Sequence, residues 1–220
     1  MSRLPLWLAA AVGVALVAAG AVLADNSNKE KIRRTPAGNA RARAEVLLRA
    51  DVGKGWSGGF KKPDLNSTLP CAYHPKQSDL VVVGAAETRW DRPIASEIGS
   101  EAQVLRTAAM VRKDWRRTVT APQVVPCLLR AFKKSLGSHG KVVSFGVVPF
   151  PRLATYTRAF RVRAKVNTGS GSVPMESYFV ALGAGRDELS LSNAAIGPDR
   201  ASLRANTLRL ARILAHRLHS

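Results

Sequence analysis

Residues 153–166, LATYTRAFRVRAKV, decide how this sequence folds, because apolar and basic side chains alternate along them. Successive side chains of a β-strand point to opposite faces of the sheet, so a period of two predicts a strand. One face of that strand carries Tyr156, Arg158, Phe160, Val162, Ala164 and Val166. The other carries Arg161, Arg163 and Lys165. We therefore expect a sheet with one apolar face and one face in water.

Three further segments around this stretch have the same character. They are residues 142–150, 173–182 and 188–195, and turn residues separate them at 169–171 and 183–187. Consecutive strands on short connections pair antiparallel, so the second half of the chain predicts a four-stranded meander.

The first half of the chain predicts one more strand and three helices. Residues 79–90 are rich in β-formers, and residues 51–60 predict a glycine-rich turn in which Trp56 covers the core. Helices are predicted at residues 40–50, 100–116 and 126–136, with another at 199–218 closing the chain. In the second of these, Ser100 and Gln103 resemble a capping pair.

Together these elements predict an α+β fold. We expect an antiparallel sheet of about five strands with helices packed on its one apolar face. Residues 40–220 would form a single domain, and the polar residues 25–39 a flexible linker before it.

The apolar run from Leu4 to Ala24 predicts an N-terminal signal peptide or membrane-anchor helix. Val22 and Ala24 suit a cleavage site after Ala24. Retention as an anchor is the alternative, since the basic residues of 29–34 oppose translocation of that flank. No cysteine lies near the run, which excludes a bacterial lipid anchor. Either way, the predicted location is extracytoplasmic: secreted if the run is cleaved, and anchored to the cytoplasmic membrane by residues 4–24 if it is retained.

The chain has a formal net charge of +19 and an isoelectric point near 11.2. Such a charge is typical of nucleic-acid binding, but export separates the protein from nucleic acid. The expected partners are therefore anionic lipid, wall polymer or polyphosphate.

The two cysteines, Cys71 and Cys127, predict one disulfide in an exported chain. Two buried free thiols are the alternative. No C-x-x-C sequence is present, which disfavours a thiol oxidoreductase.

Few residues suggest chemistry. The histidines, at positions 74, 139, 216 and 219, have no metal-ligand spacing, and no Walker, G-x-S-x-G or H-E-x-x-H motif occurs. We expect no catalytic residue, metal or cofactor, although Glu87 with Asp91 stays open as an acid–base pair.

Arg161, Arg163 and Lys165 form the candidate binding feature, a basic strip that Arg152 or Arg186 could extend from neighbouring turns. Guanidinium groups suit phosphate and carboxylate ligands. The alternative is a strand face that is simply solvated.

Several short sequences carry a family resemblance. They are Leu47–Asp51 leading into Gly55-Trp56, the Ser100-Glu101-Ala102 segment, Trp115, and Cys127-Leu128. With them, residues 40–218 resemble the extracellular sensor domains of actinobacterial PknH-like Ser/Thr kinases and their small secreted relatives, although this chain has no kinase domain. The resemblance implies a ligand-binding or envelope-interaction module with a cleft.

The leading functional hypothesis is thus an exported, non-catalytic binding or sensor-like module of the cell envelope, recognising anionic ligands or polymers. A structural envelope protein without a small ligand is the alternative, followed by a small secreted enzyme. A cleft beside the sheet favours the first hypothesis, and converging titratable groups in a pocket favour the last.

Overall fold

The computed structural model describes residues 29–65, 73, 75–92, 96–168, 171–197 and 200–218. The fold is α+β, as the sequence predicts. The apolar run 4–24, Cys71, His74 and His219 lie outside the described residues. Among the described helices, none has the length and apolar character needed to cross a bilayer.

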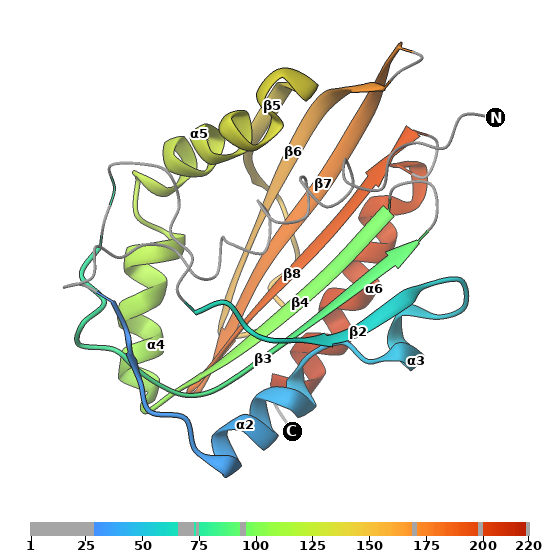
Figure 1. Ribbon diagram of the computed structural model, residues 1–220. Coiled ribbons are helices and arrows are strands. Elements are labelled where there is room, and N and C mark those ends of the chain that lie inside the picture. The colour runs from blue at the N-terminus through green and yellow to red at the C-terminus, as the bar shows by residue number, and fades with distance from the viewer. Residues whose placement is uncertain are drawn as a thin grey trace.

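One mixed sheet of eight strands crosses the molecule (Figure 1). Its main path runs β1-β3-β4-β8-β7-β6-β5, and β2 pairs with β3 beside that path. The strands are β1 (Lys31–Ile32), β2 (Ser57–Lys61), β3 (Val81–Arg92), β4 (Ser96–Leu105), β5 (Gly140–Val148), β6 (Tyr156–Thr168), β7 (Gly171–Ala184) and β8 (Asp187–Ile196).

The predicted meander is confirmed, since β5, β6, β7 and β8 pair antiparallel in chain order. The predicted five-stranded antiparallel sheet is wrong in extent. β4 adds to the free side of β8, β3 adds to β4, and the two-residue β1 pairs parallel with β3. A two-residue strand such as β1 is too short to show any periodicity in the sequence.

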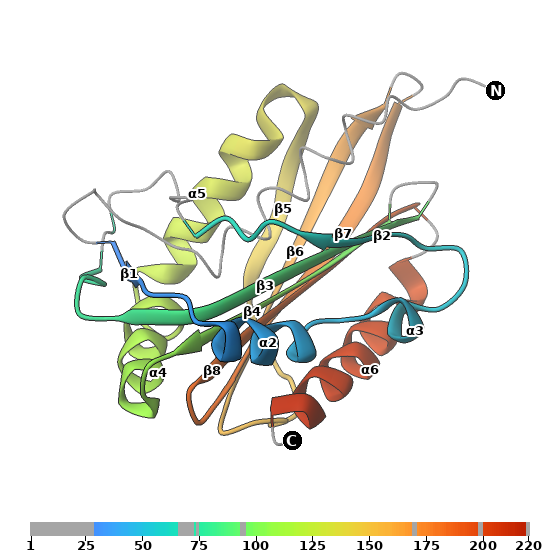
Figure 2. The ribbon, with the colours of Figure 1, turned by 60° about the horizontal axis from the view of Figure 1, so that its bottom comes forward.

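Helices cover both faces of this sheet, where the sequence predicted helices on one face (Figure 2). We name the two sides the α6 face and the α5 face. The α6 face carries α2 (Pro36–Glu45), α3 (Arg49–Val52) and α6 (Arg200–Leu218). The α5 face carries α4 (Ala108–Asp114), the π-helical turn η1 (Trp115–Val119) and α5 (Val124–Leu136), which the 3-10 turn η2 (Gly137–His139) follows.

Each face has its own apolar core. On the α6 face, Leu210 and Leu214 of α6 pack with Leu182 and Leu191 of the sheet. On the α5 face, Leu128 and Phe132 of α5 pack with strand residues that include Phe160, Phe179 and Met175. The apolar face predicted for residues 153–166 is therefore the one under α5.

The helix predicted at 100–116 is wrong over its first half. Residues 96–105 form β4, whose ten residues are all buried, between β3 and β8. Because both faces of this strand are covered, its sequence shows no clean alternation, and polar residues in it resemble a helix cap. Helical structure begins only at Ala108, where Thr107 caps α4.

Part of the segment predicted as a linker, 25–39, belongs to the fold. Lys31 and Ile32 pair with Val81 and Val82, and Thr35 Oγ1 accepts a hydrogen bond of 3.0 Å from Gly38 N at the start of α2. The described domain thus begins well before residue 40.

The 51–60 segment, predicted as a turn, ends in β2. Trp56 just before β2 is buried in the core of the α6 face, and the Arg92 guanidinium lies 5.6 Å from its ring centroid. The core-covering position predicted for this tryptophan agrees with its burial.

Candidate functional site

A cavity lies between the α5 face of the sheet and the helical layer above it. Its empty space amounts to about 530 Å³, part of it open to solvent. Its apolar wall includes Trp115, Val119, Val124, Leu128, Phe160, Phe179 and Ala181. Its polar wall consists of Glu101, Gln103, Asp114, Thr118, Glu188 and Ser190.

Two neighbouring strands bring the polar wall together. Glu101 and Gln103 project from the same face of β4, because they are two residues apart. In the antiparallel register, Glu101 is opposite Ser190 and Gln103 is opposite Glu188. Side chains far apart in sequence therefore meet on one small area of the sheet.

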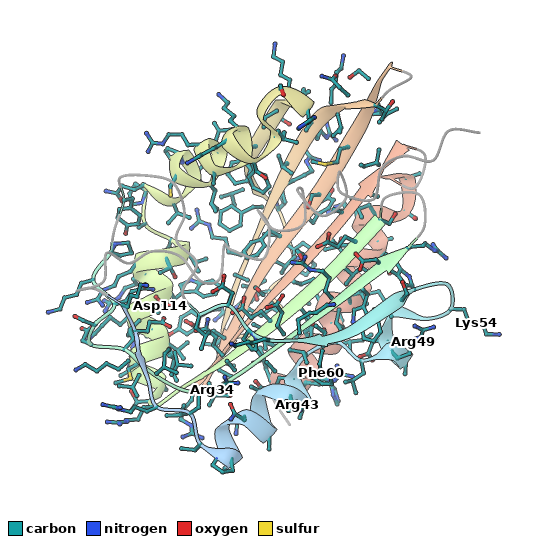
Figure 3. All side chains as sticks on the ribbon, viewed as in Figure 1. Arg34, Arg43, Arg49, Lys54, Phe60 and Asp114 are labelled. Carbon is teal, nitrogen blue, oxygen red and sulfur yellow. The ribbon has the colours of Figure 1, made fainter. Side chains whose placement is uncertain are left out.

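Asp114 reaches this area from α4 (labelled in Figure 3). Gln77 Nε2 donates to Asp114 Oδ1 at 3.2 Å. The carboxyl groups of Asp114 and Glu188 lie close enough for the charge of Asp114 to raise the pKa of Glu188. Within the described residues, the buried Glu188 Oε1 has no hydrogen-bond partner.

Burial and crowding raise the pKa values of the whole cluster. Burial raises the pKa of Glu101 to about 8. Burial, followed by the charges of Asp114 and Glu101, raises the pKa of Glu30 to about 8 as well. The pKa values of Asp114 and Glu188 also lie above their usual range, chiefly because of burial. We call Glu30, Glu101, Asp114 and Glu188 the carboxyl cluster.

Within the described chain, no Lys or Arg forms a salt bridge with any member of the carboxyl cluster. The neutral side chains of Gln77 and Gln103 donate hydrogen bonds to the cluster instead. Gln77 donates to Asp114, and Gln103 donates to Glu101 Oε1 at 3.1 Å. The cluster thus combines raised pKa values with the lack, among the described residues, of a salt-bridged cation, beside an aromatic wall.

The described residues include no group of three or more His, Cys, Asp or Glu side chains arranged to hold a metal ion. His139 and His216 are exposed at η2 and on α6. Carboxyl groups next to aromatic rings favour an organic cation with an apolar part, because the charge meets carboxylate and the hydrocarbon meets the rings.

A second row of acidic side chains lies on the α5 face of β3 and β4, the face that also carries Glu101. Arg89 Nε lies 3.5 Å from Glu97 Oε1, and burial raises the pKa of Glu97 to about 7. Glu87 and Asp91 both belong to this row, but four residues of strand separate their Cα atoms by about 13 Å. This separation disfavours the direct acid–base pair that the sequence left open.

The predicted basic strip lies on the α6 face of β6. Arg163 and Lys165 are exposed, but Arg161 is half-buried opposite Tyr178. Arg163 Nε lies 3.4 Å from Glu176 Oε2, so part of the charge of the strip is balanced.

The predicted extensions of the strip lie elsewhere. Arg152 and Arg186 are near the end of β6 where Tyr156 pairs with Gly183, away from Lys165. Lys141 of β5 joins the strip instead, as the register partner of Lys165.

Cys127 is buried near the start of α5. Its predicted partner, Cys71, lies outside the described residues, so the disulfide stays a prediction.

Reasoning from the sequence expected a cleft only through the family resemblance and did not predict where this cavity lies or what lines it. It placed Glu101 and Gln103 in a helix and did not single out Asp114 or Glu188. A signal was present: in a chain with 34 basic and 15 acidic residues, Glu97, Glu101 and Glu188 stand inside or beside apolar strand segments. Acidic residues there are unusual unless they face an internal polar site.

No known protein-family model matches this chain, and no curated protein matches it. Function is therefore inferred from the chemistry of the cavity.

Proposed function

We propose that this protein is an exported, non-catalytic binding module whose cavity takes a small organic cation with an apolar body. The single observation that carries the proposal is the carboxyl cluster, whose members form no salt bridge with a Lys or Arg of the described residues and lie beside a wall that includes Trp115, Phe160 and Phe179. The envelope location comes from the apolar run 4–24, and it stays a prediction.

The lining of the cavity supports a small ligand. Its empty space of about 530 Å³ includes volume that is open to solvent, so the evidence is the chemistry of its walls and not its size. One wall is aromatic and aliphatic and the other offers carboxyl and amide groups, which suits a ligand with a hydrocarbon part and one polar head.

The cluster favours a cationic head over an anionic one. An anion would raise the pKa values of these carboxyl groups further, whereas an ammonium or guanidinium group would supply a counter-charge for their ionised form. A ligand cation would also lower the raised pKa values of Glu101 and Glu188, so that binding releases protons.

The anionic ligand predicted for the basic strip is not part of this proposal. Arg163 is paired with Glu176, and Arg161 is half-buried against Tyr178. These contacts leave Lys165 and Lys141 as the better exposed charges of that surface.

Two matched ligands test the proposal: 2-phenylethylamine and its uncharged isostere 2-phenylethanol. The chain from Asp25 onward is used, because it holds every described element and both apolar cores. Titration calorimetry is expected to show that the amine binds at least about tenfold more tightly than the alcohol, as a charge-assisted hydrogen bond predicts.

Substitutions locate the site. Glu101→Gln and Glu188→Gln should each weaken amine binding about tenfold. Glu45→Gln is the matched control, because Glu45 is also buried with a pKa raised to about 8 by burial but lies under α2 on the other face. Circular dichroism verifies that each variant is folded. Equal affinity for amine and alcohol, or equal effects of Glu101→Gln and Glu45→Gln, would refute the proposal.

A further inference from the structure

Three segments meet at the edge of the sheet where the described chain begins: residues 29–34, 75–82 and 104–118. Lys31 N donates to Leu80 O at 3.0 Å, and Arg106 N donates to Val81 O at 2.9 Å. Arg117 Nη1 donates to Asp79 Oδ1 at 2.8 Å. Figures 1 and 2 both show β1 beside α4 at this edge.

This edge is strongly cationic. Its three segments contain ten basic residues and three acidic ones, Glu30, Asp79 and Asp114. Glu30 and Asp114 belong to the internal carboxyl cluster. Asp79, at the surface, is bound by Lys113 at 2.9 Å and by Arg117 at 2.8 Å, and these two cations hold its pKa well below the usual range.

The carboxylates of this edge are thus turned inward or neutralised, while most of its cations face solvent. The exposed members include Lys31, Arg33, Lys76, Arg106, Arg112 and Arg116, and we call these six the basic patch. Arg34 is exposed too, but it donates to Asn39 Oδ1 and to the carbonyl oxygen of Ala85. Side chains tipped with nitrogen surround α4 in Figure 3. The patch is therefore a surface of one sign of charge.

The sequence places this patch next to the predicted membrane segment. Only residues 25–28 separate the apolar run that ends at Ala24 from the first described residue. Four residues span at most about 14 Å when fully extended. A domain anchored by residues 4–24 would hold the patch within reach of the lipid headgroups, close to the screening length of about 10 Å in physiological salt.

We infer that the basic patch docks this domain on an anionic lipid bilayer. The occupant is the bilayer surface itself, because a flat, extended anionic surface matches cations spread over a strand, a loop and a helix. If the apolar run stays as an anchor, the patch orients the domain against the membrane. If the run is removed, the patch alone supplies the attachment.

Co-sedimentation tests this inference with the chain from Asp25 onward. The probes are vesicles of phosphatidylcholine with and without phosphatidylglycerol. Binding is expected only to the anionic vesicles, and it should weaken as salt is raised.

Two charge-matched triple variants locate the surface. Arg106→Gln/Arg112→Gln/Arg116→Gln should bind anionic vesicles at least about tenfold more weakly, since each cation near an anionic membrane contributes measurably. The control, Arg161→Gln/Arg163→Gln/Lys165→Gln, removes three positive charges on the other face of the sheet and should stay within about twofold of the unmodified chain. A second patch variant, Arg33→Gln/Lys76→Gln, repeats the test should the first lose its fold by circular dichroism.

Equal losses in the patch and strip variants would overturn the inference, because net charge alone would then explain binding. Equal binding to neutral vesicles would overturn it too. Tighter binding to duplex DNA than to anionic vesicles would assign the patch to nucleic acid instead. Binding of 2-phenylethylamine is measured on the same patch variants and should be unchanged, so failure of this inference is distinct from failure of the cavity proposal.

Discussion

Gln77 Nε2 donates a hydrogen bond of 3.2 Å to Asp114 Oδ1 and so joins the segment before β3 to the wall of the cavity. Asp114 also lies close to Glu188, and the Thr118 hydroxyl donates to the backbone carbonyl oxygen of Asp114 at 3.0 Å. Gln77 and Thr118 are neutral donors, and burial is the main cause that raises the pKa of Asp114. Burial also raises the pKa of Glu101 to about 8.

The first prediction concerns stability against pH. The pKa of Glu101 is raised to about 8 in the folded chain, so between about pH 4.5 and 8 the folded chain binds more protons than the unfolded one. The contribution of Glu101 to stability should therefore be greatest below about pH 4.5, and it should be lost as the pH rises through about 8. Urea unfolding is expected to give at least about 1 kcal/mol less stability at pH 8.5 than at pH 5.5.

The variant Glu101→Gln removes this titration and should reduce that difference between the two pH values. Lys54→Gln, an exposed change in the turn between α3 and β2, is the control and should leave the difference unchanged. A stability that rises between pH 5.5 and 8.5 would contradict the buried, protonated state of the cluster.

The second prediction concerns the close approach of α2 to β3. A Cβ atom on Gly84 would collide with the backbone carbonyl of Gly38, and one on Gly38 would collide with the carbonyl of Val83. Gly84→Ala is thus expected to reduce the free energy of unfolding by about 2 kcal/mol.

Gly146→Ala in β5 is the matched control for Gly84→Ala. Nothing lies within 4 Å of an added Cβ there, so the change should stay within about 0.5 kcal/mol. Denaturant unfolding of both variants checks the pair, and similar stabilities would show that α2 does not lie this close to β3.

The third prediction concerns the ion pair between α2 and the start of β8. Arg41 donates to the fully buried Asp187 at 2.9 and 2.6 Å, and its Nε lies 3.3 Å from Glu45 Oε1. Arg41→Gln leaves a buried carboxylate without its cation and should cost about 2 kcal/mol, a value reduced because Arg41 is half-exposed. Arg212→Gln, an exposed change on α6, should be neutral in the same thermal unfolding assay.

The fourth prediction concerns the cysteines. Intact mass under non-reducing conditions should be about 2 Da below the reduced mass, because a disulfide between Cys71 and Cys127 removes two hydrogens. Reduction should lower stability by about 4 kcal/mol, as expected for closure of a long loop. Two alkylatable thiols in the unreduced protein would contradict the pairing.

The sequence predicted β5 and β6 of the meander because polar and apolar residues alternate along strands that are exposed on part of one face. Residues 153–166 are the clearest case, and the amphipathic pattern of residues 126–136 and 199–218 predicted α5 and α6 for the same reason. When one side of a helix or strand faces solvent, its polar and apolar residues alternate with the period of that element, and the sequence then indicates the element. β8, and β7 from Met175 onward, are largely buried, and the turn residues on either side of them indicated these strands instead.

The position of β4 and the cavity could not be predicted, because they depend on tertiary contacts that no local sequence pattern indicates. β4 is buried on both faces, so Ser100, Glu101 and Gln103 resembled a helix start. The cavity depends on the register that sets Gln103 opposite Glu188 and on Asp114 arriving from another layer. Local sequence holds the acidic residues, but only the tertiary fold places them together.

The most direct test of the central claim is the number of protons released when the chain from Asp25 onward binds 2-phenylethylamine. Titration calorimetry at pH 7 in two buffers of different ionisation enthalpy measures that number. Because Glu101 and Glu30 have pKa values of about 8 before binding, we expect the release of about one proton per ligand, and a smaller release in Glu101→Gln. Binding with no proton release, or with the same release in Glu101→Gln, would contradict a cation held by the carboxyl cluster.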